Sequence, residues 1–238
     1  RGGKERGSRL VAIHGSASDR QLELSLGRPG DETEGGTRGE DAPVEGEDLM
    51  ERVLGRENLR RALRQVRRNR GAPGIDGMTV DGLVAHLKTH WSAIRASLVE
   101  GTYEPQPVRR VAIPKAGGGT RNLGVPVVLD RFIEQAVLQV LQAEWDPTFS
   151  DGSFGFRPGR SAHQAVARAQ TYIRKGYAWV IDIDLEQCFY RVNHDVLLSR
   201  VRARVKDRRV VALIHRFLKA GVFTLEGVRE PTVEGTPQ

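Results

Sequence analysis

Two aspartates interrupt an apolar stretch in the second half of the chain. Residues 178–183 are apolar enough to form a buried strand, and Asp182 and Asp184 lie within it or directly after it. Side chains of a strand alternate between two faces, so both carboxylates would share one face with Val180. A buried carboxylate is costly unless it is hydrogen-bonded, paired with a cation or bound to a metal ion. The stretch therefore indicates either a reactive site or a structural ion pair.

Both interpretations stay open from this stretch alone. In the structural one, one aspartate caps the next turn and the other pairs with an arginine. The residues that follow favour a site: Phe189 comes five residues after Asp184, and Asn193-His194-Asp195 is typical of the start of a helix. The single cysteine, Cys188, lies between them, and we expect it to be a small buried side chain rather than a reactive thiol.

Composition limits the class of protein. The chain has 238 residues, enough for one or two domains, and a net charge of +7. Residues 1–46 hold seven Lys and Arg against nine Asp and Glu, which leaves 30 against 21 in the remainder. This basic excess indicates a polyanionic partner. We find no apolar run of about 18 residues and no signal peptide, so we expect a cytoplasmic protein without membrane contact.

The chain changes character at residue 47. Residues 1–46 are rich in Gly, Ser, Asp and Glu without apolar periodicity, which predicts a disordered leader. From Glu47, apolar residues at helical spacing predict a helix that Gly71 would cap. Its arginines form a solvated face or bind a phosphate backbone, and their density favours binding. Seven of them fall within fifteen residues: Arg56, Arg60, Arg61, Arg64, Arg67, Arg68 and Arg70.

A glycine-rich hairpin follows. Val108–Pro114 and residues 121–126 alternate like strands, and Lys115 and Arg121 flank a turn with three consecutive glycines. Backbone amides, lysine and arginine suit a triphosphate, because arginine can bind phosphate through two hydrogen bonds. The alternative is a hairpin whose charges only face solvent.

Helix starts can be placed from capping residues. Asp81 is expected to cap a helix to about Ala96, and Asp130 a helix to about Glu144. Near the C-terminal end, residues 195–206 and 208–220 read as two helices, followed by a hairpin turn at residues 223–227.

The segment before the next helix combines a cap with cations. Ser161 and Gln164 have the spacing of a capping box. Arg157 and Arg160 precede this cap, beside a helix N-terminus that favours phosphate. The adjoining aromatic side chains, Phe154 and Phe156, either stack on bases or fill core, and we favour core.

Together these blocks resemble reverse transcriptases, in particular those encoded by bacterial group II introns. The resemblance covers residues 47–238 with the blocks in the family's order. The matching blocks are Gly-Ala-Pro-Gly-Ile-Asp-Gly at 71–77, Pro-Lys-x5-Arg at 114–121, Ser-Phe-Gly-Phe-Arg-Pro-Gly-Arg-Ser-Ala-His at 153–163, Asp-x4-Phe with Arg-Val-Asn-His-Asp at 184–195, and Gly-Thr-Pro-Gln at 235–238.

The resemblance implies an α+β right-hand polymerase fold. It divides the chain into the leader 1–46, an N-terminal extension 47–107 with the basic helix and a template loop, fingers 108–175, and the first part of a palm 176–238. The implied reaction is RNA-directed DNA synthesis. The implied partners are an RNA template, a DNA primer, deoxynucleoside triphosphates and, through a maturase role in splicing, a group II intron RNA.

The resemblance also assigns the site residues. Two Mg²⁺ ions would clamp the attacking and leaving oxygens, held by catalytic Asp184 and the carbonyl of Leu185. Phe189 would pack under the incoming sugar. The nucleotide-binding set is Lys115, Arg121, Phe189 and Gln238. The RNA-binding set is Arg60, Arg64, Arg67, Arg68, Gly74, Ile75, Asp76, Arg157 and Arg160.

The chain departs from the family pattern in two respects. Tyr190 stands where the family commonly has Asp. A Tyr-Ala-Asp-Asp block, which supplies further metal ligands in the family, does not occur in the sequence, and Asp182 is a poor substitute about 6.5–7 Å along a strand from Asp184. Because the sequence begins without Met and stops inside a motif, we expect a piece of a longer protein that does not polymerise alone.

Two other readings remain. The chain would be a non-catalytic RNA-binding remnant, or the reverse transcriptase of another retroelement lineage such as a retron. The loop at 71–78 argues against the second, since the N-terminal extension is the group II feature.

Overall fold

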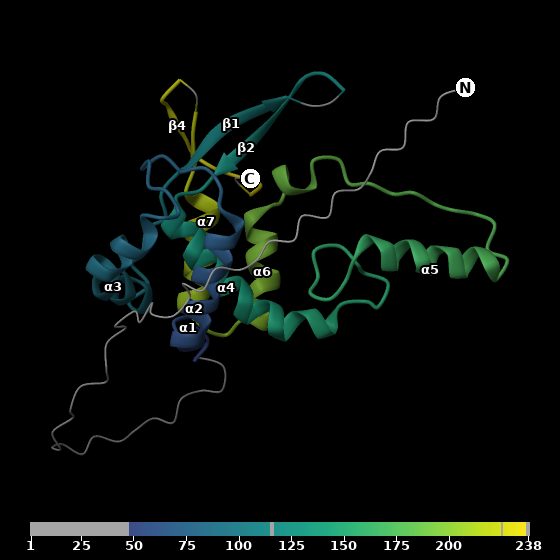
Figure 1. The fold of residues 1–238 in the computed structure, drawn as a ribbon, viewed down its shortest axis with the longest axis horizontal. Helices are drawn as coiled ribbons and strands as arrows, with labels where there is room; N and C mark the ends of the chain where they lie inside the picture. The colour runs from purple at the N-terminus through teal and green to yellow at the C-terminus, as the bar shows by residue number, and fades with distance from the viewer. Residues whose placement is uncertain (1–47, 115–116, 225, 237–238) are drawn as a thin grey trace, which may run out of the picture. The chain divides into compact units, whose positions relative to one another are not determined.

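The computed structural model describes residues 48–114, 117–224 and 226–236. The predicted leader 1–46 and the predicted nucleotide-binding residues Lys115 and Gln238 lie outside this range. The described part mixes helices and a small sheet, which confirms the α+β class (Figure 1). The helices are α1 Leu49–Val53, α2 Arg56–Asn69, α3 Leu83–Val99, α4 Val128–Trp145, α5 Ala162–Arg174, α6 His194–Arg204 and α7 Arg208–Lys219. The strands are β1 Val108–Pro114, β2 Thr120–Val125, β3 Val222–Phe223 and β4 Arg229–Glu230, and η1 Asp146–Thr148 and η2 Cys188–Tyr190 are short 3₁₀ turns.

The core forms where α1, α2 and α4 pack together. The apolar stripe of α2 is buried, as the sequence predicts, but the helix is not continuous: Gly55, in an extended conformation, separates α1 from α2. Arg70, rather than Gly71, is the C-cap of α2. The buried Asn58 amide links the three helices, donating to the carbonyl of Val53 at 2.8 Å and to that of Ala136 at 2.9 Å.

Of the four predicted helix N-caps, two are present in the structure and two are not. The Ser161–Gln164 capping box at α5 and the Asn193 cap at α6 are confirmed. The predicted Asp81 and Asp130 caps are wrong, because the N-caps of α3 and α4 are Gly82 and Val127. The Asp130 carboxylate lies inside α4 and bonds to distant groups instead.

The sheet joins distant parts of the chain. The predicted hairpin is confirmed as β1 and β2, paired antiparallel with Ile113 opposite Arg121. The predicted late hairpin is β3 and β4. A short parallel pairing of Val108 with Val222 connects the two hairpins, in the strand order β2-β1-β3-β4.

The strand predicted at residues 178–183 does not form. This stretch is extended, and its apolar side chains are exposed, Trp179 at 93% and Ile181 at 84%. A strand needs a partner for its backbone groups, and no strand in the described ranges pairs with it. Two burial predictions fail as well, since Cys188 is exposed and Phe156 is fully exposed with a φ of 55°.

Candidate nucleotide and metal site

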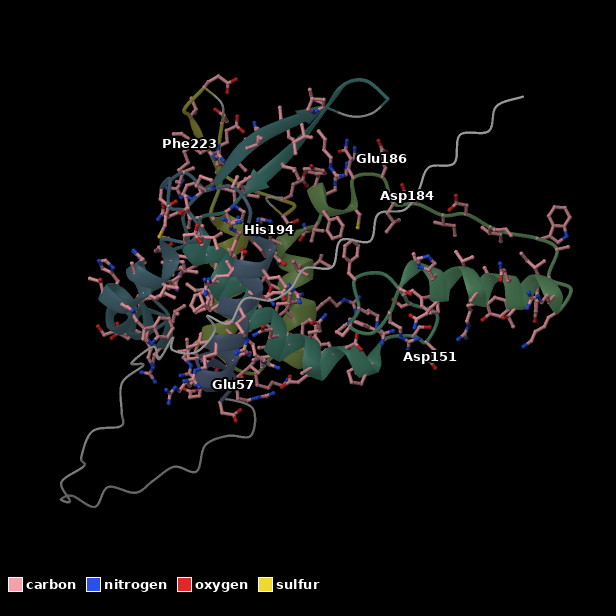
Figure 2. All side chains as sticks on the ribbon, viewed as in Figure 1. Glu57, Asp151, Asp184, Glu186, His194 and Phe223 are labelled. Carbon is pink, nitrogen blue, oxygen red and sulfur yellow. The ribbon has the colours of Figure 1, made fainter. Side chains whose placement is uncertain are left out.

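Asp184 lies on the exposed stretch between α5 and η2, with Glu186 two residues further on (Figure 2). Within the described ranges, its carboxylate accepts no hydrogen bond and forms no ion pair, and the same holds for Asp182. The structural interpretation of the pair, a turn cap and an arginine partner, therefore finds no support among these residues. Both carboxylates are free to bind a cation or solvent.

A tight turn follows Asp184 and directs the next side chains. Gln187 adopts a left-handed conformation with φ 51°, and the amide of Cys188 donates to the carbonyl of Leu185 at 3.3 Å. The turn continues into η2, which leaves the ring of Phe189 56% exposed. Asn193 then caps α6 by accepting from the amide of Val196 at 3.0 Å. The turn is thus fixed to the first helix after it.

The segment near the end of the described chain docks on this turn. The amide of Thr236 donates to the carbonyl of Phe189, and the amide of Gly235 to that of Val192, both at 2.8 Å. Gly235 has a φ of 74°, and a Cβ there would lie 2.4 Å from the carbonyl oxygen of Tyr190. Only glycine fits this position without moving the turn. Two regions that the sequence assigns to nucleotide binding, around Phe189 and just before Gln238, therefore lie side by side.

Tyr190 connects the same turn to the hairpin. Its hydroxyl donates to the carbonyl of Asn122 on β2 at 3.1 Å, one residue from Arg121. Beside this bond lies a cavity of about 340 Å³ whose lining includes Asn122, Tyr190 and Thr236. The tyrosine that departs from the family pattern, Tyr190, thus bonds the turn to the β1–β2 hairpin. The structure brings the neighbourhoods of Arg121, Phe189 and Thr236 together.

Two arginines from the underlying elements, Arg109 and Arg131, hold the backbone of the loop at residues 71–78. Arg131 of α4 donates to the carbonyls of Arg70 at 3.3 Å and Ala72 at 2.8 Å, and Arg109 of β1 donates to that of Pro73 at 2.8 Å. Gly74 is buried against α4, where a Cβ would lie 2.6 Å from the Cα of Val127. The loop conformation is therefore dictated by the core beneath it.

The tip of this loop faces outward. The Asp76 carboxylate accepts from the amide of Met78 at 3.0 Å, which closes a small turn. Asp76 is exposed and Ile75 is partly buried. The tip is accessible, while Gly74 is the buried anchor of the loop.

The arginines of α2 lie opposite its buried stripe. Arg67 and Arg68 are exposed and make no ion pair with any described residue, and Arg60 is partly exposed. Arg64 lies 3.4 Å from Glu57 in an exposed pair, which contributes little to stability. This face of α2 is therefore available to an anionic partner.

Comparison with known proteins places the chain. The family model described as "Reverse transcriptase (RNA-dependent DNA polymerase)" matches residues 113–238. The chain belongs to the reverse transcriptase family. Reverse transcriptases act on nucleic acids and generally use divalent metal ions.

Named relatives refine this placement. The chain is similar to protein YkfC of Escherichia coli K12, with 36% identity over 197 residues, covering 80% of this chain and 51% of YkfC. It is similar to the group II intron-encoded protein LtrA of Lactococcus lactis subsp. cremoris, with 37% identity over 173 residues, covering 71% of this chain and 28% of LtrA. The predicted resemblance to group II intron reverse transcriptases is confirmed. The chain spans about half of YkfC and less than a third of LtrA.

A solved structure supports the reverse transcriptase fold. A chain of the "Partial Cas6-RT-Cas1--Cas2 complex" superimposes with a TM-score of 0.51 and 20% identity, covering 80% of this chain and 31% of that one. At this identity the likeness concerns the fold alone. Across the described residues, no helix is long and apolar enough to cross a membrane.

In this reverse transcriptase, Arg157 is already engaged by its own segment. Its guanidinium bonds to the Asp146 carboxylate at 2.8 Å and to the carbonyls of Ser150 and Ser153 at 2.8 and 3.0 Å, and its side chain is only 7% exposed. The hydrogen bonds from Arg157 hold the pKa of the Asp146 carboxyl below its usual value. Arg157 therefore organises the turn before α5.

Arg160 is less constrained. It stacks 5.5 Å above the Phe154 ring and lies 3.4 Å from the exposed carboxylate of Asp151. An arginine on an aromatic face still presents edge N–H groups to an anion. Of the two arginines predicted to bind RNA here, Arg160 is the more available.

Sequence reasoning missed a pair of acids one turn apart on α4, the buried Asp130 and the partly buried Glu134. Asp130 is 2% exposed and accepts from the Tyr103 hydroxyl at 2.6 Å and the Gln106 amide at 2.9 Å. Burial raises the pKa of Asp130 to about 6 and that of Glu134, one turn later, to about 7. Both line an apolar cavity of about 570 Å³ between α4, α7 and the sheet. The i, i+4 spacing of two acids was the available signal.

Proposed function

We propose that the chain supplies the template- and nucleotide-binding part of a group II intron reverse transcriptase, an RNA-directed DNA polymerase. The observation that carries this proposal is the docking of Gly235 and Thr236 on the turn after Asp184. The docked segment lies on the turn that bears the exposed Phe189 ring and follows Asp184. Tyr190 of the same turn bonds to Asn122 of the hairpin that bears Arg121. The nucleotide-binding set is Arg121, Phe189 and, outside the described residues, Lys115 and Gln238.

Residues 47–107 act as the extension that contacts the RNA template, 108–175 as fingers and 176–238 as the beginning of the palm. The exposed arginines of α2 and the tip of the loop at Asp76 offer a basic surface and an accessible turn on the same segment. Neutralising phosphates along an RNA backbone requires such a row of cations. The cognate partners are an RNA template, a DNA primer and deoxynucleoside triphosphates.

Asp184 and the carbonyl of Leu185 bind Mg²⁺ in this proposal. Carboxylate and carbonyl oxygens are the ligands that Mg²⁺ prefers, and neither Asp184 oxygen is occupied by a described residue. Bound metal ions stabilise the attacking and leaving oxygens of the transfer. No group of three or more His, Cys, Asp or Glu gathers anywhere in the described ranges. The residues present fit part of a two-ion site, and polymerisation needs further ligands.

Primer extension tests the assignment. The substitution Asp184→Ala, made in the longest protein that contains this chain, should lower the rate of extension on an RNA template at least about a thousandfold. Its thermal stability should stay the same, because the carboxylate makes no bond to a described residue. Asp182→Ala is the matched control and should retain most activity. Unchanged extension by Asp184→Ala would refute the catalytic role.

A second role is maturase assistance to intron splicing, supported by the likeness to a group II intron-encoded protein. It uses the α2 arginines rather than Asp184. Replacing Arg67 and Arg68 by Gln should weaken binding to the group II intron RNA about tenfold at moderate salt and reduce its salt dependence. Equal RNA affinity of this variant and the parent would contradict the role.

A further inference from the structure

His194 is the first residue of α6 and lies where the helix meets the docked segment (Figure 2). It is 4% exposed, and its Nε2 lies 2.7 Å from the carbonyl oxygen of Gly235. A carbonyl only accepts, so Nε2 carries the proton and donates. The ring thus joins α6 to a segment 41 residues later in the chain.

The other ring nitrogen, Nδ1, makes no comparable hydrogen bond among the described residues. Nδ1 of His194 is buried and makes no hydrogen bond to a described residue. With the proton on Nε2, Nδ1 is left as an acceptor without a described partner. Within the described residues, the bond to Gly235 is therefore the ring's polar contact.

The docked segment depends on few side-chain bonds. Its backbone makes the two bonds to Phe189 and Val192 described above, and the Thr236 hydroxyl adds a long contact of 3.5 Å to the Phe189 carbonyl. Both backbone bonds end on the turn that α6 follows. His194 adds a bond from α6 to the same segment. Its contact with the Gly235 carbonyl joins the two backbone bonds to Phe189 and Val192 in fixing the position of the segment.

We propose that His194 is a positioning residue, which holds Gly235 against Val192 and Thr236 against Phe189 and thereby sets the depth of the nucleotide site. The role rests on the proposed polymerase function. His194 does not touch substrate. It acts through the segment that leads to Gln238. A ring that only filled core would be replaceable by an apolar side chain of similar size, whereas this role needs an N–H donor at the position of Nε2.

Two substitutions separate these roles. Gln places its side-chain N–H₂ near the position of Nε2, whereas Leu fills similar space without a donor. In the longest protein that contains this chain, His194→Leu should raise KM for the incoming deoxynucleotide about tenfold with a smaller change in kcat. His194→Gln should stay within about threefold of the parent in both constants.

Hydrogen exchange of the peptide that spans residues 233–238 gives a readout that does not need activity. Protection of the Gly235 and Thr236 amides should fall in His194→Leu and persist in His194→Gln. Parental KM and parental protection in His194→Leu would overturn the proposal, as would equal losses in both variants. If the parent protein extends no primer, the proposed function fails, and the exchange experiment still decides whether His194 holds the segment.

Discussion

The loop at residues 71–78 contains one family block and the stretch at residues 177–185 leads into another, yet the two are held by the fold in opposite ways. The loop is held by Arg109 and Arg131, and Gly74 is pressed against Val127. The stretch with Asp184 has exposed side chains and no strand partner in the described ranges. The comparison shows that the loop is fixed by the core beneath it, whereas Asp184, the proposed metal ligand, is fixed within the described residues through the turn after it.

The largest expected effect is on the loop. Gly74→Ala would place a Cβ 2.6 Å from backbone atoms of α4, so the loop or the helix must move. We expect a loss of about 3 kcal/mol in the free energy of unfolding, measured with urea. Gly77→Ala is the matched control. Its Cβ meets nothing within 4 Å, and only its φ of 70° is unfavourable, so it should cost about 1 kcal/mol.

Glu134 lies on α4, the helix that holds the loop through Arg131, and it predicts a pH dependence of stability. Burial raises the pKa of Glu134 to about 7, above its value in the unfolded chain. The folded state then holds a proton that the unfolded state releases, so stability should be greatest below about pH 4 for this group and should fall as pH rises to 7. Glu134→Gln should flatten this decline and stabilise the protein at pH 7.5 by about 1–2 kcal/mol.

Urea unfolding at several pH values between 5 and 7.5 measures this effect. Glu100→Gln, an exposed acid at the end of α3, should leave the decline unchanged. A parental slope in Glu134→Gln would show that Glu134 does not carry the proton.

A smaller effect is expected at Tyr190, in the turn that follows the exposed stretch. Tyr190→Phe removes the hydroxyl that donates to Asn122 and keeps the ring. The expected loss is about 0.5–1.5 kcal/mol in thermal unfolding. Tyr177→Phe, at an exposed ring in the loose stretch, serves as the control and should have no effect. Equal stability of Tyr190→Phe and the parent would mean that the turn is not tied to β2 in solution.

The smallest effect should occur in the stretch itself. Ile181→Ser changes a side chain that is 84% exposed, so the free energy of unfolding of the chain of 238 residues should change by less than about 0.5 kcal/mol. Solubility should improve, because an exposed apolar run favours association. A loss of about 1–3 kcal/mol would show instead that this stretch is buried in solution, and would remove the contrast between the two regions.

The features that sequence predicts well are those set by neighbours in the chain. The Ser161–Gln164 capping box, the Asn193 cap and the β1–β2 hairpin each depend on residues a few positions apart. The predicted strand at 178–183 does not form. The alternation of side chains along one segment gives no information on whether a second strand is present to pair with it.

Long-range partners account for the other errors. The predicted Asp130 cap is wrong because its carboxylate accepts hydrogen bonds from the Tyr103 hydroxyl and the Gln106 amide in the core. Asp207 was not singled out, although it caps α7 and also accepts from the amide of Met50, 157 residues earlier. The motifs of the site are predictable from the sequence. The docking of Gly235 and Thr236 on the turn at Phe189 and Val192 is not, because it depends on residues far apart in the chain.

The segments before and after the exposed stretch contact each other directly, beginning with the pairing of β1 with β3. The peptide connection through the stretch is therefore not needed to keep these segments together. Val108 pairs with Val222, Met50 bonds to Asp207, and Glu51 pairs with Arg209, so contacts on either side of residues 177–185 bridge it. Among the described residues, we expect a protease to cut in that exposed backbone. The two pieces would remain associated as a nicked complex, and co-expression of residues 1–180 with 181–238 should reconstitute the fold without a peptide bond between them.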